Sequence, residues 1–243
     1  AGVTSVAPGD HVSMSFIPSC GRCKWCVSGR QNLCDLGAQL FDIGMITDGR
    51  IAHKVGDTTL ARMCQVGSFA EHLLVAESAV VKVEPDIPWH AVALVSCGVA
   101  TGFGSSVHRA EVKPGDNVAV IGCGGIGMNA IQGAKIAGAK RVIAIDPVEF
   151  KREKAMEFGA THTYSSIEEA QAEISALTWG EMCDKTILTV GVMTGDLIEP
   201  SLGLTSKGGT CVVTAVANMM ENDAKLNSFM FAMMNKELKG CLF

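Results

Sequence analysis

The sequence predicts an α/β fold in which a doubly wound parallel sheet of six strands follows a smaller β domain. From Val118 to the end of the 243-residue chain, short apolar runs alternate with helical patterns. This alternation is typical of βαβ units, because each helix returns the chain to the next parallel strand. Before Val118, short apolar runs are separated by turns and by a cysteine-rich loop. We therefore expect the parallel sheet only in the second part of the chain.

The elements of the second part follow from hydrophobic periodicity and from capping residues. Ser166 and Glu169 have the spacing of a capping box, and Gly159 stands where a helix would end. We expect strands at residues 118–121, 141–145, 161–164, 185–190, 210–216 and 238–243. We expect helices at residues 126–137, 149–158, 166–177, 195–204 and 228–234. Six strands complete a doubly wound sheet of the dinucleotide-binding type.

A glycine-rich turn joins the first expected strand to the first expected helix. Gly122, Gly124 and Gly127 have the spacing G-x-G-x-x-G, and Asp146 follows Gly127 by 19 residues. Gly122 permits a tight turn, Gly124 lets the backbone approach a pyrophosphate, and Gly127 lets the helix pack closely. Asp146 can accept hydrogen bonds from ribose hydroxyls and would repel a 2′-phosphate. The alternative is a glycine-rich turn without a ligand. Because a strand, the glycine loop, a helix, a second strand and an acidic residue follow one another in register, the sequence predicts dinucleotide binding. Asp146 predicts that NAD is preferred over NADP.

Four cysteines form a second motif. Cys20, Cys23, Cys26 and Cys34 have the spacing C-x2-C-x2-C-x7-C. Four thiolates can form a tetrahedral shell about 2.3 Å from zinc, and this shell leaves no open position for a substrate. We therefore expect a structural zinc loop at about residues 18–36. The alternatives are disulfides, which a reducing compartment disfavours, and an iron–sulfur cluster, which commonly has another final spacing and a following proline.

The rest of the first part is less regular. We expect a turn and a strand within residues 8–17, strands at residues 67–75 and 79–83, and helices at residues 87–95 and 102–109. Taken alone, Cys97 is typical of a small buried apolar residue, and Thr101 is typical of a helix cap. The domain boundary is expected near residue 97, which gives domains at residues 1–97 and 98–243.

Composition argues against several functional classes. The net charge is −5, 48% of residues are hydrophobic, and no cluster of Lys and Arg suggests a nucleic-acid surface. The longest apolar region surrounds the glycine-rich turn and is a poor membrane span, because it carries glycines and polar residues. We find no signal peptide, and ten clustered cysteines favour metal ligands in a reducing compartment. We expect a cytoplasmic protein that binds neither nucleic acid nor membrane.

The order of these motifs resembles the zinc-containing medium-chain alcohol dehydrogenases over nearly the whole chain. The motifs are the four-cysteine loop, C-G-V-A-T-G at Cys97–Gly102 and G-C-G-G-I-G at Gly122–Gly127. Within that family, D-P-V-E-F-K-R-E at Asp146–Glu153, G-A-T-H-T-Y and T-V-G-V-M-T-G are most similar to the bacterial dimethylnitrosoaniline-dependent, nicotinoprotein-type enzymes. The resemblance implies part of a GroES-like catalytic domain at residues 1–97 and an NAD-binding Rossmann domain at residues 98–243.

The resemblance also implies roles for individual residues. Cys97 would bind the catalytic zinc, and Thr101 would lie beside the nicotinamide. Asp146 and Lys151 would contact the adenosine ribose, although Lys151 alone is equally typical of a solvated helix lysine. The remaining cofactor residues would be Gly122, Gly124, Gly125, Ile126, Gly127, Thr189, Val190, Ala215, Val216 and Phe243.

The implied reaction is hydride transfer between a primary alcohol or aldehyde and NAD, with zinc as a Lewis acid. The family's other catalytic-zinc ligands are missing, and none of the six histidines stands in a ligand-like pairing. We therefore expect an internal fragment of a longer homo-oligomeric dehydrogenase, and we expect the fragment itself to be inactive. The alternatives are a thiol-adduct (class III type) formaldehyde dehydrogenase and a non-catalytic NAD- and zinc-binding module.

Overall fold

The computed structural model describes residues 2–37, 49–51, 53–60, 67–220 and 223–243. The chain divides into two compact units. Unit 1 is Ala1–Cys97 and unit 2 is Gly98–Phe243. The two buried hydrophobic clusters that fill the parallel sheet both belong to unit 2.

The regular elements of unit 1 are short. β1 (Val12–Met14) pairs antiparallel with β4 (Val80–Lys82), and β2 (Lys54–Val55) pairs antiparallel with β3 (Thr58–Thr59). The helical elements among its described residues are α1 (Lys24–Val27), η1 (Gln31–Leu33), η3 (Glu77–Ala79) and α2 (Trp89–Leu94), and the π-helical turn η4 (Val95–Val99) continues into unit 2. Both strand pairs described in this unit are antiparallel, as expected of a small β domain.

The strand expected at residues 67–75 is wrong. These residues form bends and irregular chain, and residues 67–74 are all exposed. A strand pattern is selected by burial of alternate residues on one face. Because Phe69 and Leu74 are exposed to solvent, this segment has no buried face that would favour a strand.

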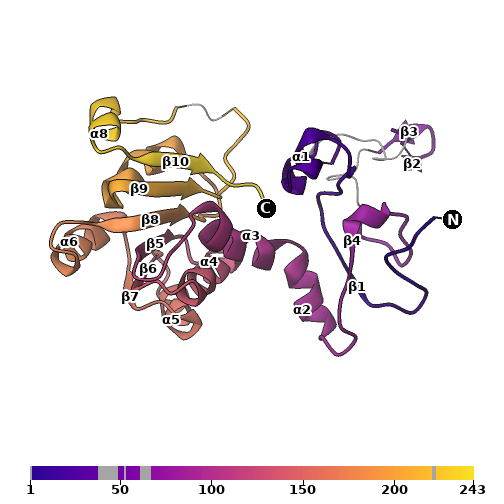
Figure 1. The fold of residues 1–243 in the computed structure, drawn as a ribbon, viewed down its shortest axis with the longest axis horizontal. Helices are drawn as coiled ribbons and strands as arrows, with labels where there is room; N and C mark the ends of the chain where they lie inside the picture. Colours follow the sequence, from indigo (N-terminus) through magenta and orange to yellow (C-terminus); the bar gives the residue numbers. More distant parts are fainter. Residues whose placement is uncertain (1, 38–48, 52, 61–66, 221–222) are drawn as a thin grey trace. The chain divides into compact units, whose positions relative to one another are not determined.

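Unit 2 is built on a parallel sheet of six strands, which Figure 1 shows side by side. The strands are β5 (Asn117–Ile121), β6 (Arg141–Ile145), β7 (His162–Tyr164), β8 (Cys183–Leu188), β9 (Thr205–Val213) and β10 (Glu237–Gly240). Their order is β10-β9-β8-β5-β6-β7, and every neighbouring pair is parallel. This order confirms the doubly wound sheet, and the two halves diverge between β5 and β8. Ligands of such sheets bind at the carboxyl ends of the strands beside this divergence.

Two buried clusters fill the opposite faces of the sheet. On β5, Val118 and Val120 contribute to one cluster, while Ala119 and Ile121 contribute to the other. This division follows from the period of two along a strand. The first face is covered by α4 (Gly125–Ile136) and α5 (Glu149–Phe158), and the second by α6 (Ile167–Leu177) and α7 (Ile198–Leu204). The sheet is therefore buried on both sides, as its apolar strands predict.

Helix ends in unit 2 follow the capping residues in the sequence. Gly159 ends α5 with a φ of 115°, and the Ser166 hydroxyl accepts the N–H of Glu169 at 3.2 Å, at the start of α6. In a capping box the Glu169 carboxylate would accept the N–H of the cap residue, Ser166. Here it accepts the N–H of the preceding residue, Ser165, at 2.8 Å. Asn227 caps α8 (Ser228–Met233) in the same way as Ser166 caps α6.

One strand begins earlier than expected. β9 starts at Thr205, directly after α7, whereas the sequence pattern suggested residue 210. Its pairing with β8 shifts register between Cys183 and Lys185, and Gly208 has a φ of 69°. A glycine at positive φ inside a strand is typical of a bulge, so hydrophobic alternation is lost over this stretch.

A helical stretch of 21 residues runs from Trp89 to Arg109, with a mean hydropathy of 1.3. Length and composition alone would let it cross a membrane, whereas the sequence pattern predicted two separate helices at residues 87–95 and 102–109. Its second half, α3 (Ala100–Gly104) and η5 (Ser105–Arg109), packs on α4, where the Ser106 hydroxyl donates to the carbonyl of Ala130 at 2.6 Å. Thr101 lies inside α3, so its expected role as a helix cap is wrong.

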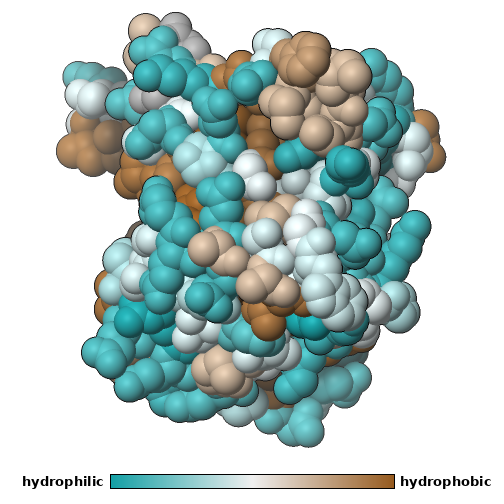
Figure 2. All heavy atoms as spheres, turned by 90° about the vertical axis from the view of Figure 1, so that its left-hand side faces the viewer, coloured by the Kyte–Doolittle hydropathy of each residue, from teal (hydrophilic) through white to brown (hydrophobic). Residues whose placement is uncertain are grey.

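Figure 2 shows the side of unit 2 that carries α6 and α8, where most of the surface is hydrophilic. Large apolar side chains are nonetheless exposed in and before α8. They are Met219, Met220, Phe229, Met230 and Met233.

Candidate functional sites

The four cysteines of the first motif lie together in unit 1. The sulfur atoms of Cys20, Cys23, Cys26 and Cys34 all lie within 4.8 Å of one another. The Cys26 sulfur is 3.5 Å from that of Cys23 and 4.0 Å from that of Cys20. Four sulfurs about 2.3 Å from a tetrahedral zinc ion lie about 3.8 Å apart, whereas a disulfide bond is about 2.05 Å long. The spacing therefore fits a metal and not disulfides.

Backbone groups hold this arrangement. The N–H groups of Cys20 and Gly37 donate to the sulfur of Cys34 at 3.2 and 3.3 Å. A Cβ at Gly37 would lie 1.4 Å from the carbonyl oxygen of Pro18, so only glycine lets the two ends of the loop meet. The zinc loop, as we call Pro18–Gly37, thus carries all four sulfur donors on one closed segment.

The thiols of this group differ in pKa. The N–H of Asp35, with further hydrogen bonds from the loop, lowers the pKa of Cys23 to about 6. Burial raises the pKa of Cys26 to about 12. Without a cation, the Cys23 thiol therefore loses its proton readily, whereas burial opposes loss of the proton from Cys26. A bound divalent cation removes this opposition, because all four ligands bind as thiolates, and four soft sulfur donors favour zinc.

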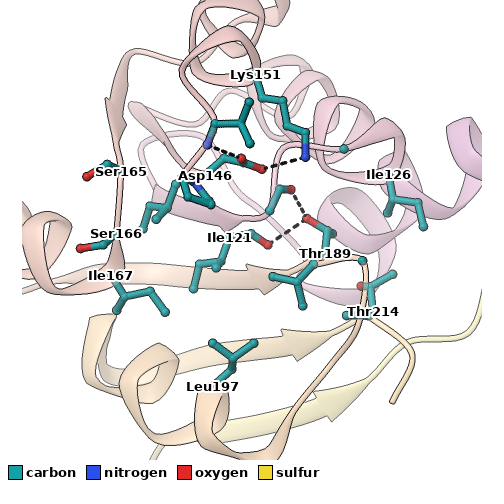
Figure 3. Close-up of a pocket in the computed structure, with 18 of the residues that line it drawn as sticks. Ile121, Ile126, Asp146, Lys151, Ser165, Ser166, Ile167, Thr189, Leu197 and Thr214 are labelled. Atoms are coloured by element: carbon teal, nitrogen blue, oxygen red, sulfur yellow. Dashed lines mark hydrogen bonds and ion pairs between the residues drawn. The ribbon is translucent and has the colours of Figure 1, made fainter. Parts of the chain in front are cut away.

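In unit 2, the glycine-rich turn connects β5 to α4 (Figure 3). Gly122 has a φ of 94°, and a Cβ there would lie 2.7 Å from the nitrogen of Val190. A Cβ at Gly127 would lie 1.9 Å from the carbonyl oxygen of Gly122. The Thr189 hydroxyl donates to the carbonyls of Ile121 at 3.1 Å and Gly122 at 2.6 Å. The protein itself therefore requires glycine at positions 122 and 127.

Gly124 and Gly125 have the opposite environment. A Cβ at either position would meet no protein atom within 4 Å. Gly124 is the N-cap of α4 and Gly125 is its first residue, and both line a cavity. The first turn of a helix has free N–H groups and the positive end of the helix dipole, which together bind phosphate.

Asp146 stands at the end of β6 and is only 4% exposed. Its Oδ1 accepts the N–H of Val148 at 2.9 Å, and its Oδ2 accepts the N–H of Cys123 at 2.8 Å. The Nζ of Lys151 lies 3.6 Å from Oδ2, and Figure 3 shows the two side chains pointing toward each other. Two N–H groups therefore orient the carboxylate, and a carboxylate has about four acceptor positions, which leaves capacity for ribose hydroxyls.

These features surround a cavity of about 640 Å³ at the carboxyl ends of β5, β6, β7, β8 and β9. Ten of the residues that sequence reasoning gave to the cofactor line it: Gly122, Gly124, Gly125, Ile126, Asp146, Lys151, Thr189, Val190, Ala215 and Val216. A doubly wound sheet binds its ligand at this edge.

The other predicted site residues lie elsewhere. Thr101 is buried in α3, Gly127 packs against Gly122, and Phe243 stands at the end of the described chain with a φ of 54°. Cys97 is an exposed residue of η4. In the part of the chain that the structure describes, the zinc loop holds the only group of three or more possible metal ligands, and Cys97 is not a member of it.

Sequence reasoning missed several residues of the lining. Ser165, Ser166, Ile167 and Glu168 follow β7, while Leu197 belongs to η6 (Gly195–Leu197) and Thr214 follows β9. Ser166 was interpreted only as a helix cap. Their position in the sequence could have indicated them, because residues that follow the strands of a parallel sheet lie at the edge where its ligand binds.

Comparison with known proteins gave consistent matches for both parts of the chain. Residues 1–86 match the family described as "Alcohol dehydrogenase GroES-like domain". Residues 125–243 match the family described as "Zinc-binding dehydrogenase". The two matches together include the zinc loop, the last three residues of the glycine-rich turn (Gly125–Gly127) and Asp146.

Individual relatives agree with these matches. The chain is 45% identical to "Alcohol dehydrogenase B" of Mycobacterium tuberculosis over 242 residues, which are 100% of this chain and 64% of that protein. It is 46% identical to "NDMA-dependent alcohol dehydrogenase" of Amycolatopsis methanolica, with 100% of this chain and 65% of that protein covered. A solved alcohol dehydrogenase zinc-binding domain protein of Burkholderia ambifaria has a TM-score of 0.88 at 27% identity and covers 98% of this chain and 64% of its own. The chain thus spans somewhat less than two thirds of these proteins.

Proposed function

Because the chain belongs to the zinc-containing medium-chain alcohol dehydrogenase family, we propose that its protein transfers hydride between a primary alcohol or aldehyde and NAD. The observation that carries this proposal is the cavity in unit 2. Gly124 and Gly125 leave open space at the start of α4, and the buried Asp146 carboxylate lies at the end of the next strand. A pyrophosphate and an adenosine ribose require these two features at this separation along the sheet.

The residues of this cavity have distinct tasks in our proposal. The N–H groups at Gly124 and Gly125 bind the pyrophosphate, and Asp146 accepts the ribose hydroxyls. Lys151 stands beside the same ribose and balances the carboxylate charge. Ile126, Val190, Ala215 and Val216 form the apolar floor under the nicotinamide half, and Thr189 fixes the turn from below. Thr101 and Phe243 are assigned to the nicotinamide end by family resemblance alone.

We propose two zinc sites of different kinds. The zinc loop holds a structural zinc through four thiolates, and this ion orders Pro18–Gly37. Cys97 would be one ligand of a catalytic zinc, which supplies Lewis acidity toward the alcohol oxygen when bound. The described residues do not complete that second site, so no step is assigned to them there.

We further propose that residues 1–97 belong to a GroES-like catalytic domain and residues 98–243 form the NAD-binding domain. The family match at residues 1–86 and the division of the chain at Cys97 support this organisation. A cytoplasmic homo-oligomer that acts on a small molecule is the proposed working form.

The test is an oxidation assay of the whole protein to which this chain belongs, with a series of primary alcohols. It is run with added NAD and with an artificial acceptor such as dimethylnitrosoaniline. Turnover of the alcohols supports the proposal, and the acceptor arm shows whether NAD is exchanged or retained. Turnover of a hydroxymethyl thiol adduct, but of no primary alcohol, would favour the thiol-dependent formaldehyde dehydrogenase. Tight binding of NAD and zinc without turnover of any substrate would favour a non-catalytic binding module.

A further inference from the structure

Arg152 makes contacts that neither the glycine motif nor the reaction accounts for. It lies on α5, six residues after Asp146. Its Nη1 donates to the main-chain oxygen of Asp146 at 2.8 Å and to that of Pro147 at 2.9 Å. One terminal nitrogen thus binds two successive carbonyls of the turn between β6 and α5.

This turn sets the direction of the Asp146 carboxylate. The Val148 N–H reaches back to Asp146 Oδ1 at 2.9 Å, which is the geometry of an Asx turn. Pro147 has no N–H, so the turn has few backbone donors of its own. Asp146 is buried, and its carbonyl would lose a hydrogen bond without the guanidinium. A buried carbonyl that loses its donor is costly, and the turn would rearrange to satisfy it.

Arg152 also influences the neighbouring turn after β7. The Ser165 hydroxyl and N–H hold the pKa of Glu169 below its ordinary value, and the positive charge of Arg152 adds to this effect. Ser165 and Ser166 line the same cavity as Asp146 and Lys151. The charge of the guanidinium therefore also reaches Glu169, whose hydrogen-bond partner Ser165 lines the cavity.

We propose that Arg152 is a positioning residue for the adenosine half of the dinucleotide. It locks the β6–α5 turn so that the Asp146 carboxylate is oriented before the ribose arrives. Its action passes through Asp146 and Pro147, and no contact between Arg152 and the nucleotide is required. This inference rests on the proposed NAD site and adds a residue from outside the motif.

The first experiment is a binding titration of Arg152→Met with NAD, adenosine monophosphate and nicotinamide mononucleotide. We expect the Kd for NAD and for adenosine monophosphate to rise about tenfold, because the Asp146 carboxylate would then have to be oriented during binding. The Kd for nicotinamide mononucleotide should not change, because its half of the site lies at other strand ends. Arg152→Lys should restore part of the affinity, since its ammonium group can still donate to a carbonyl.

Arg141→Met is the matched control. Arg141 begins the same strand, β6, and its Nη1 donates to Asn117 Oδ1 at 3.0 Å, at the opposite edge of the sheet. Its loss should leave all three dissociation constants unchanged. Equal loss of both mononucleotides in Arg152→Met would indicate a general structural role and would overturn the inference, as would unchanged binding of adenosine monophosphate.

Hydrogen exchange in the absence of nucleotide provides a second readout. Arg152→Met should accelerate exchange of the Val148 amide, while the β6 amide of Ile143 stays protected. Unchanged exchange at Val148 would contradict the proposed locking of the turn. If the unaltered protein failed to bind NAD, the proposed function would be wrong, and the exchange experiment would still decide whether Arg152 holds the turn.

Discussion

The zinc loop and the dinucleotide cavity are built in opposite ways. The loop takes all four sulfur donors from the segment Cys20–Cys34, and its two ends meet at Pro18 and Gly37. The cavity takes its lining from the turns after β5, β6, β7, β8 and β9. The first site is therefore encoded locally, whereas the second exists only once the sheet has formed.

This difference decides what stabilises each site. Among the loop residues, the buried ones are Cys26, Cys34 and the two ends, Pro18 and Gly37, and the two cysteines are proposed metal ligands. The cavity rests on strands such as β5 and β6, in which four of five residues are buried. We therefore expect the loop to depend on its metal and the cavity to depend on hydrophobic packing.

Removal of one zinc ligand should have the largest effect, and this effect should be confined to the zinc loop. Cys26→Ser should lose the bound zinc and the order of Pro18–Gly37, because structural zinc contributes about 10–16 kcal/mol in small zinc domains. The sheet should keep its hydrogen-exchange protection. Metal analysis after dialysis and exchange at Gly37 measure the two effects, with Cys241→Ser as a control outside the group. Retention of zinc in Cys26→Ser would contradict the assignment.

Alanine at two glycines of the same turn should separate protein packing from ligand binding. Gly127→Ala places a Cβ 1.9 Å from the Gly122 oxygen and should destabilise the fold by about 1–3 kcal/mol. Gly124→Ala meets no protein atom within 4 Å and should leave stability within about 0.5 kcal/mol of the original. Its NAD affinity should fall strongly, because the new methyl group occupies the cavity. Denaturant unfolding and NAD titration of both variants make the test, and equal loss of stability would refute it.

Much of the second unit could be predicted from the sequence because its signals are local. Residues 141–145 and 149–158 have the predicted bounds of β6 and α5, since a continuous apolar run marks the strand and Gly159 ends the helix. The four-cysteine spacing likewise predicts a compact donor group, because a short loop cannot separate its sulfurs far.

The remaining features depend on contacts between distant residues, and local patterns do not encode them. Threonine is a residue type typical of helix caps, but Thr101 lies inside a helix that packs on α4. Ser165 reaches the cavity only because β7 pairs beside β6. Arg152 is a charged residue on an amphipathic helix, and only its two carbonyl contacts distinguish it from a solvated side chain.

Replacement of Asp146 should change cofactor choice by a smaller amount. Asp146→Ser removes the carboxylate and leaves Lys151 without an anion at 3.6 Å, so a 2′-phosphate becomes acceptable. NAD affinity should fall about tenfold to a hundredfold, the equivalent of one charge-assisted hydrogen bond. NADP affinity should rise in the same variant. Parallel titrations with both cofactors provide the measurement, and an unchanged preference would show that Asp146 does not select the cofactor.

The smallest expected effect concerns Glu169 at the start of α6. The N–H and hydroxyl of Ser165 lower the pKa of this carboxyl, with the charge of Arg152 as a minor cause. A folded pKa below the unfolded one stabilises the fold above the unfolded pKa, and this stabilisation is lost as pH falls through the folded pKa. Glu169→Gln should therefore be slightly less stable than the original protein near neutral pH, and the difference should vanish in acid. The effect must be small because the side chain is exposed, where solvent screens the charge.

Glu168→Gln provides the control for this prediction. Glu168 also lies in the first turn of α6, so both carboxylates interact with the positive end of the helix dipole. Glu169 accepts hydrogen bonds from the N–H and hydroxyl of Ser165, and these bonds lower its pKa. Urea unfolding of both variants across the acid range should thus show a pH-dependent loss in Glu169→Gln that exceeds the loss in Glu168→Gln. Identical curves would assign the whole effect to the dipole and would remove Ser165 from the explanation.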